Sequence, residues 1–232
     1  KEKMMIKRDG LKKKYKDFEL DISMDIKEGT VTGLIGKNGA GKSTAIKAIL
    51  GLIHPDAGSI KVMGDVPGKN MENIGAAFSD SGMSMLYNIN DISRIMHAMY
   101  DEFEEDKFKE LCQKMELPFD KLLKDFSSGM KAKLKVLLTI SHKAKLLVLD
   151  EPTTGLDVLA RNEVMDMLRQ YLEEDATRSI LISSHISTDL EGLCDDIYMI
   201  DKGKIILHED TDVLLGQYGV LKMSEKEFEE LD

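Results

Sequence analysis

The stretch GKNGAGKST, residues 36–44, decides the fold of this chain. It matches the pattern G-x-x-x-x-G-K-[ST] in the context that this pattern requires. Thr30 to Ile35 is short, apolar and β-branched, as in a buried strand, and Thr44 to Leu50 has helical spacing. Such a loop turns its backbone N–H groups and a positive helix end toward phosphate oxygens. The sequence therefore predicts a nucleoside triphosphate site; the alternative is a glycine-rich turn that binds nothing.

Side-chain chemistry assigns roles within this loop. Lys42 is placed to reach the β and γ phosphates, and the hydroxyl of Ser43 is placed to ligate Mg²⁺. The residues that we expect to bind the nucleotide here are Gly36, Asn38, Gly39, Ala40, Gly41, Lys42, Ser43 and Thr44.

A second motif is an apolar run that ends in two carboxylates, KLLVLDE at residues 145–151. We expect this strand to lie beside the phosphate-loop strand in a parallel sheet, which would bring Asp150 to the Mg²⁺ shell. Glu151 would then polarise an attacking water, which neither a kinase nor a small GTPase needs at this point. The pair favours hydrolysis. Taken alone, the two acids could also mark a helix entry, where they offset the helix dipole.

Three further segments follow the order of a known family. The run FSSGMK at residues 126–131 precedes a helix-like stretch, GLD at residues 155–157 follows the acidic strand, and Ile180 to Ser184 is a strand-like run that ends at His185. With the phosphate loop and the acidic strand, these segments make the chain resemble the ATP-binding cassette (ABC) family from about residue 4 to about residue 209.

The resemblance implies an ATPase with ATP and Mg²⁺ as cofactors. It assigns Glu151 as general base or water positioner, and His185 as the residue that orients the γ phosphate and the water. Lys42 would support the same chemistry, with Asp150 at the metal. Tyr15 stands where the family's aromatic residue would stack on adenine.

The resemblance also implies partners. In the family, the signature segment and the phosphate loop approach one ATP from opposite sides, so two cassettes pack head to tail, as a homodimer or a heterodimer. Ser127, Ser128 and Gly129 would close the partner's site, and Asp157 would link the two sites across the interface. Transmembrane permease subunits would hold the pair on the inner face of the membrane.

Two departures from the family pattern stand out. In FSSGM, Ser128 replaces a glycine and Met130 replaces the usual glutamine, whereas Ser127 retains its hydroxyl. In the family's glutamine loop, the position where a glutamine is expected holds Ser79, and Asp80 follows it. Either Ser79 or Asp80 substitutes for that contact, or the contact is absent and the segment is a polar turn.

The role implied by the resemblance is energising a membrane transporter, an exporter of peptides, antibiotics or small hydrophobic compounds. The alternative is a soluble ABC ATPase that acts on DNA, ribosomes or iron-sulfur assembly. Against this alternative, the chain has no long heptad insertion, a single cassette and no basic linker. A net charge of −10 also argues against a nucleic-acid-binding surface, so no nucleic acid partner is expected.

Composition agrees with a cytoplasmic location. The chain has 232 residues, 42% of them hydrophobic, which is enough for one well-cored domain with a smaller helical lobe. No apolar run approaches the roughly 18 residues of a membrane span, and no secretory signal opens the chain. Cys112 and Cys194 are far apart and in no C-x-x-C motif, which indicates reduced thiols.

We expect a single α/β domain: a P-loop NTPase core with a mainly parallel sheet, an N-terminal antiparallel β layer and a small α-helical subdomain. The core and the β layer would comprise about residues 1–78 and 126–218, the helical subdomain about 79–125, and an acidic segment 219–232. Val158 to Glu173 reads as an amphipathic helix of the larger lobe.

Methionines gather at the start of the helical region. They are ordinary core filling or line an adaptable apolar groove for a partner's helix, and the ABC resemblance places the groove for a permease helix beside this lobe. These residues are Met83, Met85, Met96 and Met99.

Overall fold

The computed structural model describes residues 3–78, 83–186, 188 and 190–217. Within them the strands are β1 (Met4–Lys14), β2 (Glu19–Lys27), β3 (Val31–Ile35), β4 (Ala57–Val62), β5 (Ile74–Ala77), β6 (Leu146–Asp150), β7 (Ser179–Ser184), β8 (Asp196–Asp201) and β9 (Lys204–Asp210). The helices are α1 (Lys42–Ile49), α2 (Ile89–Met99), α3 (Glu105–Lys114), α4 (Ser128–Ile140), α5 (Val158–Glu173) and α6 (Thr211–Gln217). The predicted bounds of the helix Val158 to Glu173 are confirmed.

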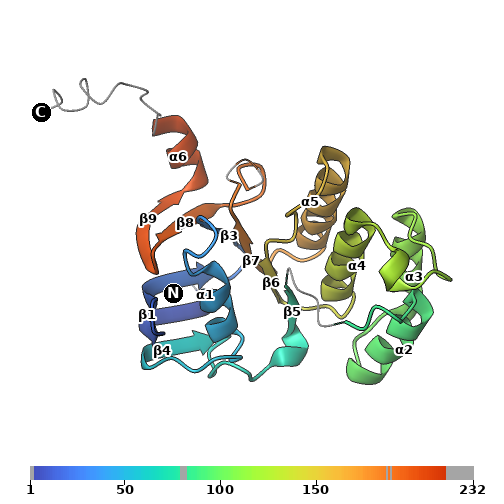
Figure 1. The fold of residues 1–232 in the computed structure, drawn as a ribbon, viewed down its shortest axis with the longest axis horizontal. Coiled ribbons are helices and arrows are strands. Elements are labelled where there is room, and N and C mark those ends of the chain that lie inside the picture. The colour runs from blue at the N-terminus through green and yellow to red at the C-terminus, as the bar shows by residue number, and fades with distance from the viewer. Residues whose placement is uncertain (1–2, 79–82, 187, 189, 218–232) are drawn as a thin grey trace, which may run out of the picture.

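The described strands form one mixed sheet in the order β4-β1-β2-β9-β8-β3-β7-β6-β5 (Figure 1). From β8 to β5 every pair of neighbours is parallel, whereas β1 runs antiparallel to both β2 and β4. Strands β3 and β6 are buried along their whole length, because both faces of a parallel sheet are covered. The predicted fold class, with its antiparallel N-terminal layer, is confirmed.

The prediction that the acidic strand β6 lies directly beside the phosphate-loop strand β3 is wrong. Strand β7 lies between β3 and β6, so the acidic strand does not pair with β3 directly. Strand order in such a sheet does not follow chain order, and β7 comes from a later part of the sequence than both. Because all three strands are parallel, their carboxyl ends still meet at one edge.

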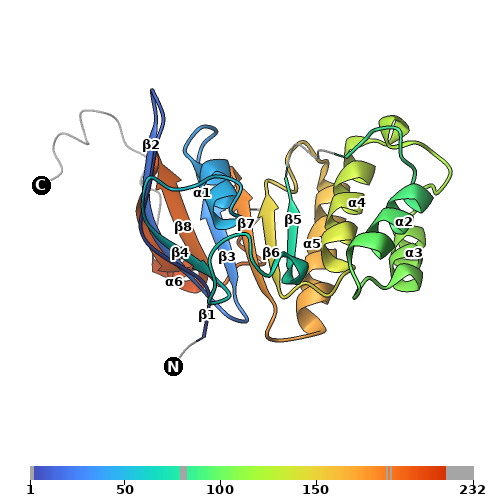
Figure 2. The same ribbon diagram turned by 90° about the horizontal axis from the view of Figure 1, so that it is seen from below.

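The two faces of the sheet build two apolar clusters. Leu146 and Val148 of β6 pack with α1 and the N-terminal strands, while Leu147 and Leu149 pack with the helices on the other side. Figure 2 shows α1 enclosed between the N-terminal strands and the centre of the sheet, with α5, α4, α2 and α3 beyond it. Each fully buried leucine or isoleucine stabilises the fold by about 1.5–3 kcal/mol.

Helices α2 and α3 form the outermost part of the structure; they pack on each other, and α3 packs on α4 (Figure 2). Helix α2 begins with a capping box, in which Asn88 Oδ1 accepts from the Asp91 N–H at 2.9 Å and Asp91 Oδ2 accepts from the Asn88 N–H at 3.1 Å. The domain boundaries near residues 79 and 125 remain predictions, and the acidic segment 219–232 lies outside the described residues.

Both cysteines are buried and unbridged, as their spacing indicated. Burial raises the pKa of Cys112 to about 12 and raises that of Cys194 further, so neither thiol is reactive. Among the described residues, none of the helices combines the length and the hydrophobicity that a membrane crossing needs.

Candidate nucleotide site

The phosphate loop connects β3 to α1. Gly39 and Gly41 have φ angles of 81° and 113°, which favour glycine, and a Cβ on Gly36 would lie 2.4 Å from the carbonyl oxygen of Ile200. No side chain among the described residues caps the start of α1, so its first N–H groups stay available for an anion. A cavity of about 200 Å³ opens over the loop. Its lining includes Asn38, Gly39, Gly41, Lys42, Ser43, Thr44 and Glu151.

Lys42 is held inside this loop. Its side chain is only 4% exposed, and Nζ donates to the carbonyl oxygens of Gly36 at 2.6 Å and Lys37 at 3.2 Å. The same Nζ lies 2.9 Å from Oε1 of Glu151. The ammonium group thus stands between the loop and the acidic strand, where a phosphate held by the loop would meet it.

Glu151 is the centre of the hydrogen-bond network at the end of β6. Its Oε2 accepts from the Thr154 hydroxyl at 2.8 Å and lies 2.9 Å from Nδ1 of His185. Burial would raise the pKa of Glu151, but the bonds from Lys42, Thr154 and His185 outweigh burial and lower it. The carboxylate is therefore ionised at neutral pH, with Lys42 paired to it.

The backbone of Glu151 is strained. Its φ angle is 50°, in the left-handed region, which costs a residue other than glycine about 1 kcal/mol or more. The Glu151 N–H donates to the hydroxyl of Ser183 at 3.0 Å, and that hydroxyl donates to Oδ1 of Asp150 at 2.6 Å. Ser183, on the intervening strand β7, thus fixes both carboxylate residues; sequence reasoning missed it, although serines in an otherwise apolar buried run were a signal.

The residues predicted to bind the metal ion, Asp150 and Ser43, offer oxygen ligands. Asp150 is buried with its carboxylate held by Ser183, and Ser43 is exposed at the start of α1. The described residues contain no cluster of three or more His, Cys, Asp or Glu that could hold a metal ion. One carboxylate and one hydroxyl suit Mg²⁺, which is usually bound by few protein oxygens, by water and by substrate phosphates.

Phe18 lines the loop cavity and Tyr15 does not, and stacking of Tyr15 on adenine stays a prediction. Tyr15 is 44% exposed in the short turn between β1 and β2, with its ring centroid 6.3 Å from that of Phe18. A Cβ on Gly41 would lie 2.9 Å from Cζ of Phe18, so the ring packs against the loop. Phe18 continues the alternation of buried residues along β2, Leu20 and Ile22, and this period of two was the missed signal.

The signature segment caps a helix instead of lining this cavity. The hydroxyl of Ser127 accepts from the Met130 N–H at 3.2 Å, and Ser127 and Ser128 are exposed. Asp157 caps the neighbouring helix α5 by accepting from the Ala160 N–H at 2.8 Å. A Cβ on Gly129 would lie 3.1 Å from Cβ of Ala160, so the two helix starts touch.

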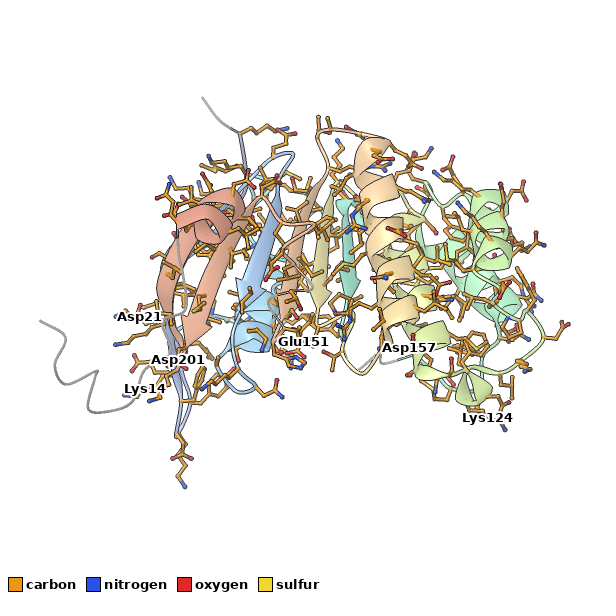
Figure 3. All side chains as sticks on the ribbon, turned by 90° about the horizontal axis from the view of Figure 1, so that it is seen from above. Lys14, Asp21, Lys124, Glu151, Asp157 and Asp201 are labelled. Atoms are coloured by element: carbon orange, nitrogen blue, oxygen red, sulfur yellow. The ribbon has the colours of Figure 1, made fainter. Side chains whose placement is uncertain are left out.

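The signature does not line the cavity over its own phosphate loop, although Ser128 lines a second cavity together with Asp150 and Glu151. Helices α1 and α4 lie on opposite sides of β7, β6 and β5 in both ribbon views (Figures 1 and 2). Figure 3 shows Glu151 and Asp157 along one edge of the molecule, with Lys14 and Lys124 toward its two ends. Ser79 and Asp80, expected at the glutamine-loop position, lie outside the described residues.

Comparisons with known proteins identify the family to which the chain belongs. The family model for ABC transporters matches residues 20–154. The lantibiotic transport ATP-binding protein SrtF of Streptococcus pyogenes is 35% identical over 90% of this chain and 92% of SrtF. The linearmycin resistance ATP-binding protein LnrL of Bacillus subtilis is 33% identical over 87% of this chain, which spans about two thirds, 68%, of LnrL. A solved ATP-binding subunit of an ABC transporter superposes with a TM-score of 0.79 at 25% identity, covering 97% of this chain and 98% of that one.

The site and the fold thus define a nucleotide-binding ATPase cassette. The chain belongs to the ABC transporter family, whose ATP-binding subunits are ATPases.

Proposed function

We propose that this chain is the ATP-hydrolysing subunit of a membrane exporter. The observation that carries the proposal is the Lys42, Glu151 and His185 constellation at the mouth of the phosphate loop. It unites a phosphate-binding cation, a general base and a residue that orients the base, as hydrolysis by an activated water requires.

The geometry suggests how nucleotide binding frees Glu151 to act as a base. When the loop N–H groups and Lys42 hold the β and γ phosphates, the Lys42 ammonium is drawn from Glu151 to the phosphate. Glu151 then accepts a proton from a water, while Thr154 and His185 keep its carboxylate oriented. Catalysis comes from positioning and charge stabilisation. Mg²⁺, which Ser43 and Asp150 would hold, neutralises phosphate charge when it is bound.

A second cassette completes the site in this proposal. The exposed Ser127 and Ser128 stand at the start of α4, where the helix dipole favours an anion. They lie across the sheet from their own phosphate loop, and therefore we propose that they contact the nucleotide of a head-to-tail partner. Asp157, on the same edge as Glu151 (Figure 3), would lie at that interface.

The permease would dock on the helical lobe. A cavity of about 290 Å³ lies between β5, α2 and α4, lined by Met83, Met96 and Tyr100 among others; we call it the groove cavity. Met83 and Met96 pack against the core, whereas Met85 and Met99 are 38% and 66% exposed. Met83 and Met96 thus fill the core, and an apolar groove with exposed methionines beside it suits a partner's helix.

The transported compounds follow from the relatives. SrtF is named for lantibiotic transport and LnrL for linearmycin resistance. We propose that this chain energises export of peptides, antibiotics or small hydrophobic compounds, and that it sits at the cytoplasmic face of the membrane through its permease.

Affinity purification of the tagged chain from detergent-solubilised membranes tests the proposal. Mass spectrometry should recover a multi-span membrane protein in fixed proportion, and vesicles that contain the complex should move a peptide antibiotic when ATP is added. Recovery of the chain with ribosomes or DNA, and with no membrane protein, would favour the soluble alternative.

A further inference from the structure

The groove cavity shares a wall with a second cavity. The second one, of about 300 Å³, lies between α4 and the end of β6, and Asp150 and Glu151 line it; we call it the carboxylate cavity. Ala77, Phe78 and Lys135 line both cavities. This wall therefore separates the proposed permease groove from the cavity of the hydrolytic carboxylates and is in contact with both.

Lys135 holds this wall together. It lies in the middle of α4, and its Nζ donates to the carbonyl oxygen of Phe78 at 3.1 Å. Phe78 is the first residue after β5. A hydrogen bond from an ammonium group is charge-assisted and about twice as strong as a neutral one. It ties the carboxyl end of the edge strand β5 to the helix that begins with the signature.

The backbones of β5 and α4 also touch, which makes the connection stiff. A Cβ on Gly75 would lie 2.4 Å from the carbonyl oxygen of Thr139 and 2.7 Å from Cδ2 of Leu147. Only glycine allows this approach, and Thr139 lies one helical turn after Lys135. A shift of α4 must therefore move β5 with it, and Lys135 passes the shift on to Phe78.

The neighbouring lysine on the same helix has a different task. Lys133 forms an ion pair with Glu163 of α5 at 2.7 Å, and neither cavity is lined by it. The two lysines thus share a helix and a charge but differ in their contacts. Lys133 is a matched control for Lys135.

We infer that Lys135 is a positioning residue that couples the groove cavity to the carboxylates of the ATPase site. The inference rests on the proposed function, because it takes the occupant of the groove to be the permease. In this chain, which lacks the family's glutamine, an occupant that presses on Phe78 alters the position of α4 beside Asp150 and Glu151 through Lys135.

The test uses the cassette–permease complex purified from membranes, with steady-state ATPase kinetics. Lys135→Met keeps the apolar stem and removes the donor. It should lower kcat about tenfold, the size expected for one charge-assisted hydrogen bond, while KM for ATP changes less than about twofold. Lys135→Arg, which keeps a charged donor, should restore kcat to within about threefold of wild type. Lys133→Met should leave both constants unchanged.

Wild-type kcat in Lys135→Met would overturn the inference, as would an equal loss of kcat in Lys133→Met or no recovery in Lys135→Arg. Glu151→Gln in the same complex separates this failure from a failure of the proposed function. If Glu151→Gln is inactive while Lys135→Met is normal, only the coupling role is lost; if Glu151→Gln still hydrolyses ATP, the proposed mechanism itself fails.

Discussion

The phosphate-loop region and the signature region would both face a nucleotide, but they differ in how many of their contacts one chain supplies. In the phosphate-loop region, a buried Lys42, an ionised Glu151 and His185 are already linked by contacts of 2.9 Å. In the signature region, Ser127 caps its own helix and Ser128 is exposed. The first region is organised by one chain, whereas the second presents polar groups outward. This difference supports the proposal that a second chain completes the site.

Among single substitutions in the phosphate-loop region, we expect Glu151→Gln to have the largest effect on activity. It removes the base but leaves the loop, so ATP should still bind while turnover falls about 10²- to 10⁴-fold, the usual contribution of general base catalysis. ATP should then trap a dimer, detectable by gel filtration. A variant that hydrolyses ATP at the wild-type rate would remove Glu151 from the mechanism.

Lys42→Ala should act on binding instead. Hydrogen bonds to charged groups contribute about 1.5–3 kcal/mol, so Kd for ATP should rise about 10- to 150-fold. Isothermal titration calorimetry of the variant measures this directly, with thermal unfolding as the control for folding. Unchanged affinity would contradict the assignment of the phosphate loop.

The network around Glu151 also predicts a pH dependence of stability. Because the pKa of Glu151 is lowered in the folded protein, its ionised form stabilises the fold above the ordinary carboxyl pKa of about 4.3. That contribution is lost as pH falls through the lowered value. Denaturant unfolding between pH 6 and pH 3 should show a steeper acid loss for wild type than for Glu151→Gln, and parallel curves would count against the ion pair with Lys42.

The smallest expected effect concerns the glutamine-loop position. A carboxylate can reach the Mg²⁺ shell through water more easily than the short serine side chain, so Asp80→Ala should lower ATPase activity of the assembled complex more than Ser79→Ala. Nucleotide affinity should change little, since the contact would form mainly in the transition state. Wild-type activity in both variants would mean that the segment has no catalytic contact.

Much of this architecture was predictable from local pattern. The buried strand before the loop, the acidic strand and the helix Val158–Glu173 follow from hydrophobic period and from turn residues, because these signals act within a few residues. The position of β7 between β3 and β6 was not predictable from such signals, since strand order depends on tertiary packing between segments that are far apart in the sequence.

The site shows the same limit. Motif matching found Lys42 and Glu151, but it did not find Ser183 or Phe18, which reach the site from other elements, or Thr154, which follows Glu151 by three residues. The short turn after β1 leaves Tyr15 exposed and turns Phe18 toward the loop, a geometry that motif position alone does not reveal.

The central claim, that two chains share each nucleotide, is open to a test with opposite outcomes. Two copies of the chain, both carrying Glu151→Gln, are joined by a flexible linker. Lys42→Ala breaks a phosphate loop, and Ser128→Glu places a carboxylate where the signature would face phosphate, at a helix start that tolerates negative charge. The two changes are placed either in the same copy or in different copies.

The measurement is the amount of ATP retained per fused pair after rapid gel filtration, with two expected when neither change is present. If each site is shared, changes in different copies leave one intact site and one retained ATP, whereas both changes in one copy break both sites and retain none. If each chain forms its own site, the pattern reverses. That reversal, or equal retention in the two arrangements, would contradict the account.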